Sequence, residues 1–184
     1  MSEELVIRQC SPTMAGIKSG NLFTCPAQSR AELTTCLREW NKRLLPRGVK
    51  ILPLKFTENR ALIYMYRPHR LQKDWQSEQA QAILRERQYP TEHVEKCVRE
   101  LISRLNTRAN FPHEIGLFLG YPPEDVRGFI QSKAQGAKCV GTWKVYGDEE
   151  TARRQFALYE KCTGIYQGIY RRGGLSDKLI VRER

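Results

Sequence analysis

Cys10 is the side chain whose position in the sequence most suggests covalent chemistry. It directly precedes Ser11 and Pro12, and serine followed by proline is typical of a helix start. A thiol placed just before a helix N-terminus has a lowered pKa, because the helix dipole favours the thiolate. A nucleophile also needs a base, and the sequence offers His113, with Glu114 to orient it or act alone. These three are the predicted catalytic residues; the alternative is a half-buried cysteine at a strand end and a histidine that caps a helix.

A looser signal points to an anion site around Lys18. Residues 16–20, GIKSG, resemble a phosphate-binding loop only partly, because the residue order differs from GxxxxGK[ST] and no buried strand leads into a glycine-rich turn. A nucleotide site of that kind is therefore excluded. What remains is a site in which Lys18 and turn amides face a carboxylate or phosphate, or else an ordinary loop.

The cysteines and histidines do not form a recognised metal motif. The six cysteines stand at irregular intervals, and neither CxxC nor HExxH occurs. His93 and Cys97 are four residues apart on an expected helix and could share a metal ion. Cys97 also lies on that helix's apolar stripe, where a free cysteine packs as a small hydrophobe. The sequence therefore identifies neither a metal nor a cofactor.

Residues 111–130, FPHEIGLFLGYPPEDVRGFI, read as a helix, a turn and a second helix. Pro112 suits the first position of one helix, Gly120 its left-handed end, and the prolines at 122–123 the start of the next. Extended to residue 133, the same stretch fits a helix-turn-helix that binds DNA. Glu124 and Asp125 at the start of the second helix would be repelled by phosphates, so an ordinary helical corner is the favoured interpretation.

Charge and length limit the partners. The chain of 184 residues has a formal net charge of +11, which favours an anionic partner such as a small ligand, with nucleic acid as the less favoured alternative. The basic residues are dispersed, as on an ordinary solvated surface. No segment resembles a secretory signal or a membrane span. We therefore expect a cytoplasmic protein with reduced thiols and no membrane span.

The periodicity of apolar residues predicts an α+β fold with a small, mostly antiparallel sheet and several packed helices. Residues 5–10 are expected to form a short strand, Ser29 and Glu32 a capping box that starts a helix, and residues 49–56 and 60–68 a hairpin in which Pro53 marks an edge strand or bulge. Helices are expected within 71–87 and after Thr91, a strand at 139–147, and a long helix after Asp148. Residues 179–181, LIV, are expected to form a last strand. No linker divides the chain, so one domain is predicted for residues 1–184.

Three segments together resemble the family called domain of unknown function 3793, an uncharacterised bacterial family common in anaerobes. The segments are CSPTMAGIKSGNLF, FPHEIGLFLGYPPEDV and GTWKVYGDEETA, and the resemblance covers nearly the whole chain. The residues that match the family's motifs are Cys10, Pro12, Gly16, Lys18, Phe23, His113, Glu114, Gly120, Tyr121, Asp125, Trp143, Lys144 and Tyr146.

The resemblance implies one domain, a cytoplasmic setting and an anaerobic host, but no established activity. Genes of this family often lie near ferrous-iron transport and flavodoxin genes, which implies iron or redox physiology. On this basis Lys18, Tyr121 and Lys144 are the predicted ligand-binding residues.

Three hypotheses for function follow, and they leave open whether the protein is an enzyme. The favoured one is a ligand- or metal-handling accessory protein of anaerobic redox or iron metabolism, with a polar pocket built from Cys10, Lys18, His113 and Glu114. The alternatives are a thiol-dependent enzyme with Cys10 as nucleophile and a helix-turn-helix protein that binds DNA through residues 111–133.

Overall fold

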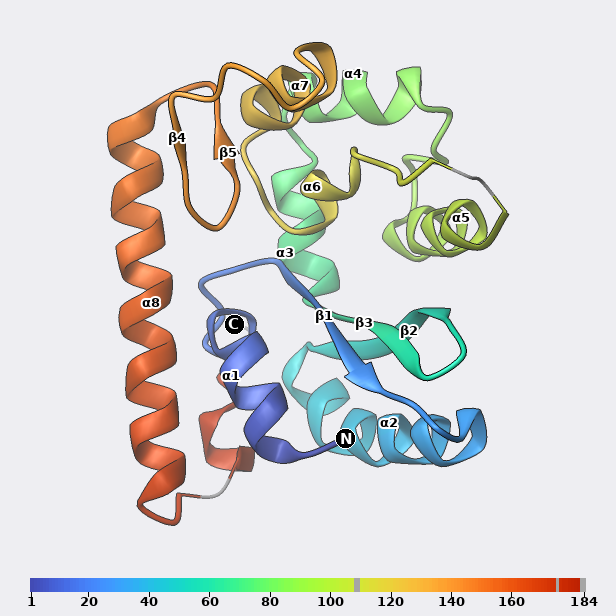
Figure 1. Ribbon diagram of the computed structural model, residues 1–184, viewed down its shortest axis with the longest axis vertical. Coiled ribbons are helices and arrows are strands. Elements are labelled where there is room, and N and C mark those ends of the chain that lie inside the picture. The colour runs from blue at the N-terminus through green and yellow to red at the C-terminus, as the bar shows by residue number, and fades with distance from the viewer. Residues whose placement is uncertain (108–109, 175, 183–184) are drawn as a thin grey trace. The chain divides into compact units, whose positions relative to one another are not determined.

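The computed structural model describes residues 1–107, 110–174 and 176–182 (Figure 1). These residues form an α+β fold with a three-stranded antiparallel sheet and a separate two-stranded hairpin, which confirms the predicted class. Two compact units make up the chain: a first unit, Met1–His69 with Tyr159–Arg184, and a second unit, Arg70–Leu158. Whether the two units behave as the one domain expected for residues 1–184 stays a prediction.

The first unit opens with a helix, α1 (Glu3–Met14), where the sequence suggested a strand followed by a helix start at Pro12. The Ser2 hydroxyl accepts a hydrogen bond from Leu5 N–H, and two acids occupy the first turn. The side chains at 6, 7, 10 and 14 are buried together at helical spacing. Pro12 lies inside the last turn. The predicted strand is therefore wrong, because the cap at Ser2 starts the helix well before Pro12.

A three-stranded sheet follows the order β1-β3-β2, with both pairings antiparallel. Strand β1 (Gly20–Pro26) and the hairpin of β2 (Lys50–Phe56) and β3 (Arg60–Tyr66) make up this sheet. Pro53 lies on the edge strand β2, and the register shifts between Pro53 and Lys55. The predicted hairpin, edge position and bulge are confirmed, because a proline without an N–H group is tolerated there.

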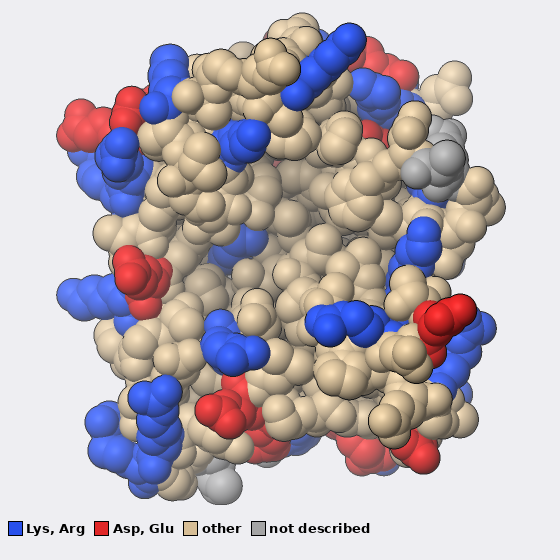
Figure 2. Space-filling view, viewed as in Figure 1, with Lys and Arg blue, Asp and Glu red and all other residues tan. Residues whose placement is uncertain are grey.

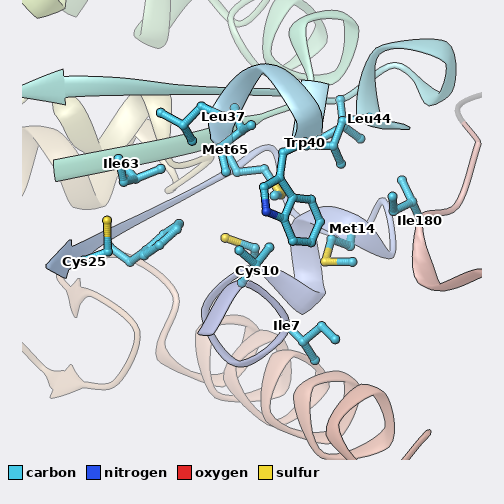
Figure 3. Close-up of a cluster of buried hydrophobic side chains, with 14 of the residues drawn as sticks. Ile7, Cys10, Met14, Cys25, Leu37, Trp40, Leu44, Ile63, Met65 and Ile180 are labelled. Carbon is cyan, nitrogen blue, oxygen red and sulfur yellow. The ribbon is translucent and has the colours of Figure 1, made fainter. Parts of the chain in front are cut away.

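Helix α2 (Arg30–Leu44) begins at the predicted capping residue, since Ser29 Oγ accepts a hydrogen bond from Glu32 N–H. A 3-10 turn, η1 (Leu45–Arg47), ends the helical run at Gly48. Helices α1 and α2 pack against the sheet and form an apolar core with it. Figure 3 shows Cys10 of α1 inside this core, near Trp40 of α2 and Met65 of β3.

Arg67, directly after β3, ties the first unit together. Only 1% of the residue is exposed, and its guanidinium donates hydrogen bonds to four backbone carbonyls. These belong to Thr13 and Met14 at the end of α1, to Arg47 in η1 and to Val181 near the end of the chain, at 2.7 to 3.2 Å. One buried side chain thus joins segments that are far apart in the sequence.

The chain near Val181 is not the strand that the sequence suggested. Residues Ser176–Leu179 form a 3-10 turn, η2, and residues 180–182 have no regular secondary structure. Val181 N–H donates to Met14 O, and Arg47 donates to Ile180 O. One backbone hydrogen bond and bonds from arginine side chains thus hold this segment in place of the regular hydrogen bonds of a strand. The predicted last strand is therefore wrong.

The second unit is built mainly of helices. They are α3 (Pro68–Asp74, which begins in the first unit), α4 (Glu78–Glu86), α5 (Val94–Thr107), α6 (Ile115–Phe118) and α7 (Pro123–Gln131). The buried side of α5 carries the predicted apolar stripe, although the helix begins at Val94 and not directly after Thr91. Trp75 and Tyr89 pack against Phe118 of α6, with ring centroids 4.9 and 5.4 Å apart.

A short hairpin and a long helix complete the fold. The residues expected as one strand at 139–147 instead fold back on themselves as β4 (Cys139–Val140) and β5 (Lys144–Val145). That prediction was wrong because alternating apolar residues cannot distinguish one strand from two short ones. Helix α8 (Glu149–Arg171) begins as predicted, since Asp148 accepts a hydrogen bond from Thr151 N–H.

Candidate functional site

The second unit contains a cavity of about 340 Å³ between the segment before α6, helix α7 and the β4–β5 hairpin. Its lining is mostly apolar and aromatic, with a few polar groups. The lining residues are Phe111, His113, Ile115, Gly116, Tyr121, Asp125, Val126, Phe129, Val140, Gly141, Thr142, Trp143 and Lys144. Such a volume and lining are typical of a site for a small organic molecule.

Aromatic rings line two parts of this cavity, which we call the aromatic cavity. Tyr121 and Trp143 are stacked, with ring centroids 4.9 Å apart and planes 28° from parallel. The His113 ring lies 5.1 Å from the Phe129 ring. Aromatic side chains that line a cavity in this way are suited to pack against a planar ring.

Asp125 fixes one of these rings in place. Its carboxylate is 3% exposed and accepts a 2.6 Å hydrogen bond from Trp143 Nε1–H. The other oxygen accepts bonds from the backbone N–H groups of Tyr146 and Gly147, each at 2.7 Å. A single acid at the start of α7 therefore anchors both the β4–β5 hairpin and the indole ring that it carries.

The hairpin also needs Gly141 at its turn. A Cβ atom on Gly141 would lie 2.3 Å from the ring of Phe156 in α8. Phe156 in turn meets Trp143 edge-on, with ring centroids 4.5 Å apart. Glycine thus allows the hairpin backbone to approach α8 closely enough to support the Trp143 wall.

Lys144 brings a positive charge to the aromatic cavity. Its Nζ donates a 2.8 Å hydrogen bond to Ala134 O and lies 6.0 Å from the centroid of the Phe129 ring. An ammonium group has three N–H donors, and this carbonyl takes one of them. An anionic oxygen on a ligand is the group that such a cation binds best.

Three of the six predicted site residues meet in this cavity: His113, Tyr121 and Lys144. They come from the segment before α6, the turn before α7 and strand β5. Cys10 and Lys18 instead belong to the first unit. The structure therefore assembles a candidate site from two of the three motif segments, and that site does not contain Cys10.

Glu114 lies apart from the aromatic cavity, in a buried ion pair. It is 5% exposed, and its Oε1 accepts a hydrogen bond from Tyr89 at 3.1 Å and lies 3.5 Å from an Arg104 nitrogen. Arg104 also bonds Glu100 at 2.6 Å. Burial and the negative charge of Glu114 raise the pKa of the Tyr89 hydroxyl, so this phenol remains a hydrogen-bond donor at neutral pH.

The surroundings of Cys10 differ from those expected of a nucleophile. It lies within α1 and not before a helix N-terminus, and none of the residue is exposed. Burial raises the pKa of its thiol, and the opposing effect of the nearby Lys18 ammonium is smaller. The predicted lowering of the pKa is therefore wrong, because the helix begins seven residues before Cys10.

Lys18 is also buried, at 2% exposure, and donates to the carbonyl of Gly20. Its Nζ lies 6.0 Å from the centroid of the Tyr159 ring. The Lys18 ammonium is near enough to Cys10 to act on the pKa of its thiol, and the lysine itself is buried. An anion site at this lysine stays a prediction.

We expect Cys10 to be among the slowest cysteines to react with iodoacetamide in the folded protein. Alkylation requires an accessible thiolate, so Cys10 should react at least about 100-fold more slowly than the partly exposed Cys36 and Cys139. Timed alkylation near neutral pH, followed by peptide mass spectrometry, measures each rate. In urea all six thiols should react at similar rates; preferential labelling of Cys10 in the folded protein would support the thiol-enzyme hypothesis instead.

The structure of residues 111–133 differs in two ways from the predicted helix-turn-helix. Helix α6 has only four residues, because Ile115, Gly116 and Leu117 donate to carbonyls three residues earlier in a tight turn; the helix start predicted at Pro112 is wrong. Gly120 has a φ of 71° and ends the turn as predicted. The second helix begins at Pro123 as expected, but its Asp125 bonds the hairpin.

The two units also differ in their formal net charge. The second unit, which contains residues 111–133, has 14 Lys and Arg against 12 Asp and Glu, a formal net charge of +2. The first unit has 17 against 8, or +9. Figure 2 shows Lys and Arg scattered over the face in view and mixed with acids. DNA binding by residues 111–133 stays a prediction, and most of the excess positive charge lies in the first unit.

A family model described as "Protein of unknown function (DUF3793)" matches residues 6–180. The chain belongs to this family. No curated protein and no solved structure matches the chain. The DUF3793 motifs that suggested the resemblance include His113, Tyr121, Trp143 and Lys144, which line the aromatic cavity.

The described part of this DUF3793 chain contains neither a metal-binding cluster of side chains nor a helix that could span a membrane. Across the described residues no group of three or more His, Cys, Asp or Glu side chains is placed to hold a metal ion. Cys97 donates to Pro90 O and is buried. This agrees with the alternative in which Cys97 packs as a small apolar side chain. None of the described helices is both long and apolar enough to cross a bilayer.

Sequence reasoning missed several residues of the site, among them Phe111, Phe129, Thr142 and the role of Asp125. Trp143 was recognised only as a motif residue. A usable signal existed, because aromatic residues alternate with glycines in FPHEIG, GYPPEDVRGF and VGTWKVYG. Those three segments contain all thirteen of the lining residues named above.

Proposed function

We propose that this DUF3793 protein is a ligand-binding protein, and that its aromatic cavity holds a small organic molecule with a planar ring and an anionic or acceptor oxygen. This proposal retains the ligand-handling part of the favoured sequence hypothesis. A role in anaerobic redox or iron metabolism rests on the family resemblance alone.

The single observation that carries the proposal is the aromatic lining of a cavity of about 340 Å³. The Tyr121–Trp143 stack and the His113–Phe129 pair offer ring faces. Burying one two-ring ligand against them removes apolar surface from water, at about 25 cal/mol for each Å² buried. Stacking adds roughly 0.5–1.5 kcal/mol for each ring pair.

Binding is better supported than covalent catalysis. The described lining residues of the cavity include no cysteine, and Cys10 is buried within the first unit. Lys144 and His113 supply polar contacts, whereas most of the other lining groups are apolar. Such a surface orients a ring and pairs with one charge, which is the task of a binding site.

The experiment compares two fluorescent probes that share one ring system. 1-Anilinonaphthalene-8-sulfonate carries an anionic group, and N-phenyl-1-naphthylamine lacks it. Lys144→Met should weaken binding of the sulfonate about tenfold, or ~1.4 kcal/mol, because the charge-assisted contact is lost. It should change the dissociation constant of the neutral probe less than about twofold, since the ring contacts remain. Fluorescence titration measures both constants.

Lys138→Met is the matched control. Lys138 also flanks the hairpin and donates to a backbone carbonyl, Gly147 O at 2.6 Å, but it does not line the aromatic cavity. It should leave both dissociation constants unchanged. Equal weakening by the two methionine variants would show that the sulfonate responds to net charge and would count against the proposed site.

A further inference from the structure

A second cavity, of about 600 Å³, adjoins the aromatic cavity. Phe111 and His113 line both, so the two cavities meet at these two side chains. The remaining lining is more polar and includes Arg87, Asn110 and Glu114. We call this space the polar cavity.

Glu114 gives the polar cavity a fixed acceptor. The side chain is more than nine-tenths buried, and both Tyr89 and Arg104 donate to its Oε1. A ligand hydroxyl that donates to this carboxylate would use Oε2. Because Tyr89 and Arg104 already fix the carboxylate, accepting such a bond requires little further ordering of the side chain.

The donors lie on the more exposed part of the same cavity. Arg87 follows α4, Asn110 precedes the segment of Phe111, and both are exposed. A guanidinium only donates hydrogen bonds, whereas an amide both donates and accepts. The polar cavity therefore combines one buried acceptor with donors near its opening.

We propose that the ligand has two parts, a planar ring in the aromatic cavity and a neutral, hydroxylated substituent in the polar cavity. Nucleosides and aryl glycosides belong to this chemical class. Hydroxyl groups of such a substituent donate to Glu114 and accept from both Arg87 and Asn110, which suits the mixed lining. A phosphate in the same place would face the buried negative charge of Glu114. This inference rests on the proposed function, because the ring must first bind in the aromatic cavity.

The test uses two neutral coumarins that differ only in the substituent. 7-Methoxy-4-methylcoumarin presents the ring, and 4-methylumbelliferyl β-D-glucoside adds a hydroxylated group at the same oxygen. The glucoside should bind about tenfold more tightly, equivalent to ~1.4 kcal/mol. Arg87→Ala and Asn110→Ala should each remove most of that advantage and leave the dissociation constant of the methoxy compound within about twofold. Arg85→Ala is the control, because Arg85 is exposed on α4 and does not line either cavity.

The outcomes separate the two proposals. If the methoxy compound binds but the glucoside binds no more tightly, the two-part ligand is wrong and the aromatic site stands. The same conclusion follows if the glucoside keeps its advantage in both alanine variants. If neither coumarin nor the naphthalene sulfonate binds, the proposed function itself fails.

Discussion

Replacing Arg67 with methionine should lower the free energy of unfolding by about 4 kcal/mol, because it removes four hydrogen bonds that each contribute roughly 1 kcal/mol. The guanidinium of this buried residue joins the end of α1, η1 and the chain near Val181. Methionine retains much of the volume but donates no hydrogen bond, so Arg47 O and Val181 O lose a charged donor. Urea unfolding followed by circular dichroism measures the change.

Two further variants show whether the geometry of the guanidinium matters. Arg67→Lys keeps the charge, but an ammonium group cannot reach carbonyls on three separate segments, so the loss should still exceed about 2 kcal/mol. Arg60→Met removes an exposed arginine at the start of β3 that bonds Thr24 Oγ1, and it should change stability by less than about 0.5 kcal/mol. A loss for Arg67→Met no larger than that for Arg60→Met would contradict the assigned role.

Replacing Asp125 with alanine should lower the free energy of unfolding by about 3 kcal/mol and weaken probe binding at least about tenfold. The change removes three hydrogen bonds and leaves buried donors of Trp143 and the hairpin backbone without their acceptor. Since the hairpin carries the Trp143 wall, the aromatic cavity should lose its shape. Urea unfolding and titration with the naphthalene sulfonate measure the two effects.

Asp125→Asn separates positioning of the indole from support of the backbone. Its one amide oxygen can still accept from the hairpin N–H groups, but the amide nitrogen then faces Trp143 Nε1–H, donor against donor. We expect a smaller loss of stability than with alanine, and a loss of binding close to that of alanine. Glu124→Gln, at the exposed neighbouring acid, is the control and should affect neither quantity. Full binding by Asp125→Ala would contradict a role of Asp125 in shaping the site.

Local sequence signals predicted the parts of the fold that local bonds determine. The helix cap at Ser29, the hairpin with Pro53 on its edge strand and the cap at Asp148 all depend on residues close together in the chain. Helix α1 was missed because LVIRQC is apolar and branched like a strand, although Ser2 and the acids after it mark a helix start. The serine and proline at 11–12 are a second helix-start motif in the same segment, and they indicate a later start than the one that the Ser2 cap produces.

The candidate site was predicted only in part, because it depends on contacts between distant segments. His113, Tyr121 and Lys144 were identified, and the structure brings them together. Asp125 was recognised as an acid at a helix start, but its partners in the hairpin lie about 20 residues later in the chain. The burial of Cys10 likewise results from packing of α1 against the sheet and α2, which spacing alone does not reveal.

The aromatic cavity is tested most directly by the indole N–H signals of the protein in a nitrogen-15 NMR titration with 1-anilinonaphthalene-8-sulfonate. Trp143 lines the cavity, whereas Trp40 lies in the core of the first unit and Trp75 Nε1–H donates to Leu117 O. We predict a saturable shift of the Trp143 indole signal, with the signals of Trp40 and Trp75 nearly unchanged. An unchanged Trp143 signal at saturating probe, or equal shifts of all three, would contradict the proposed site.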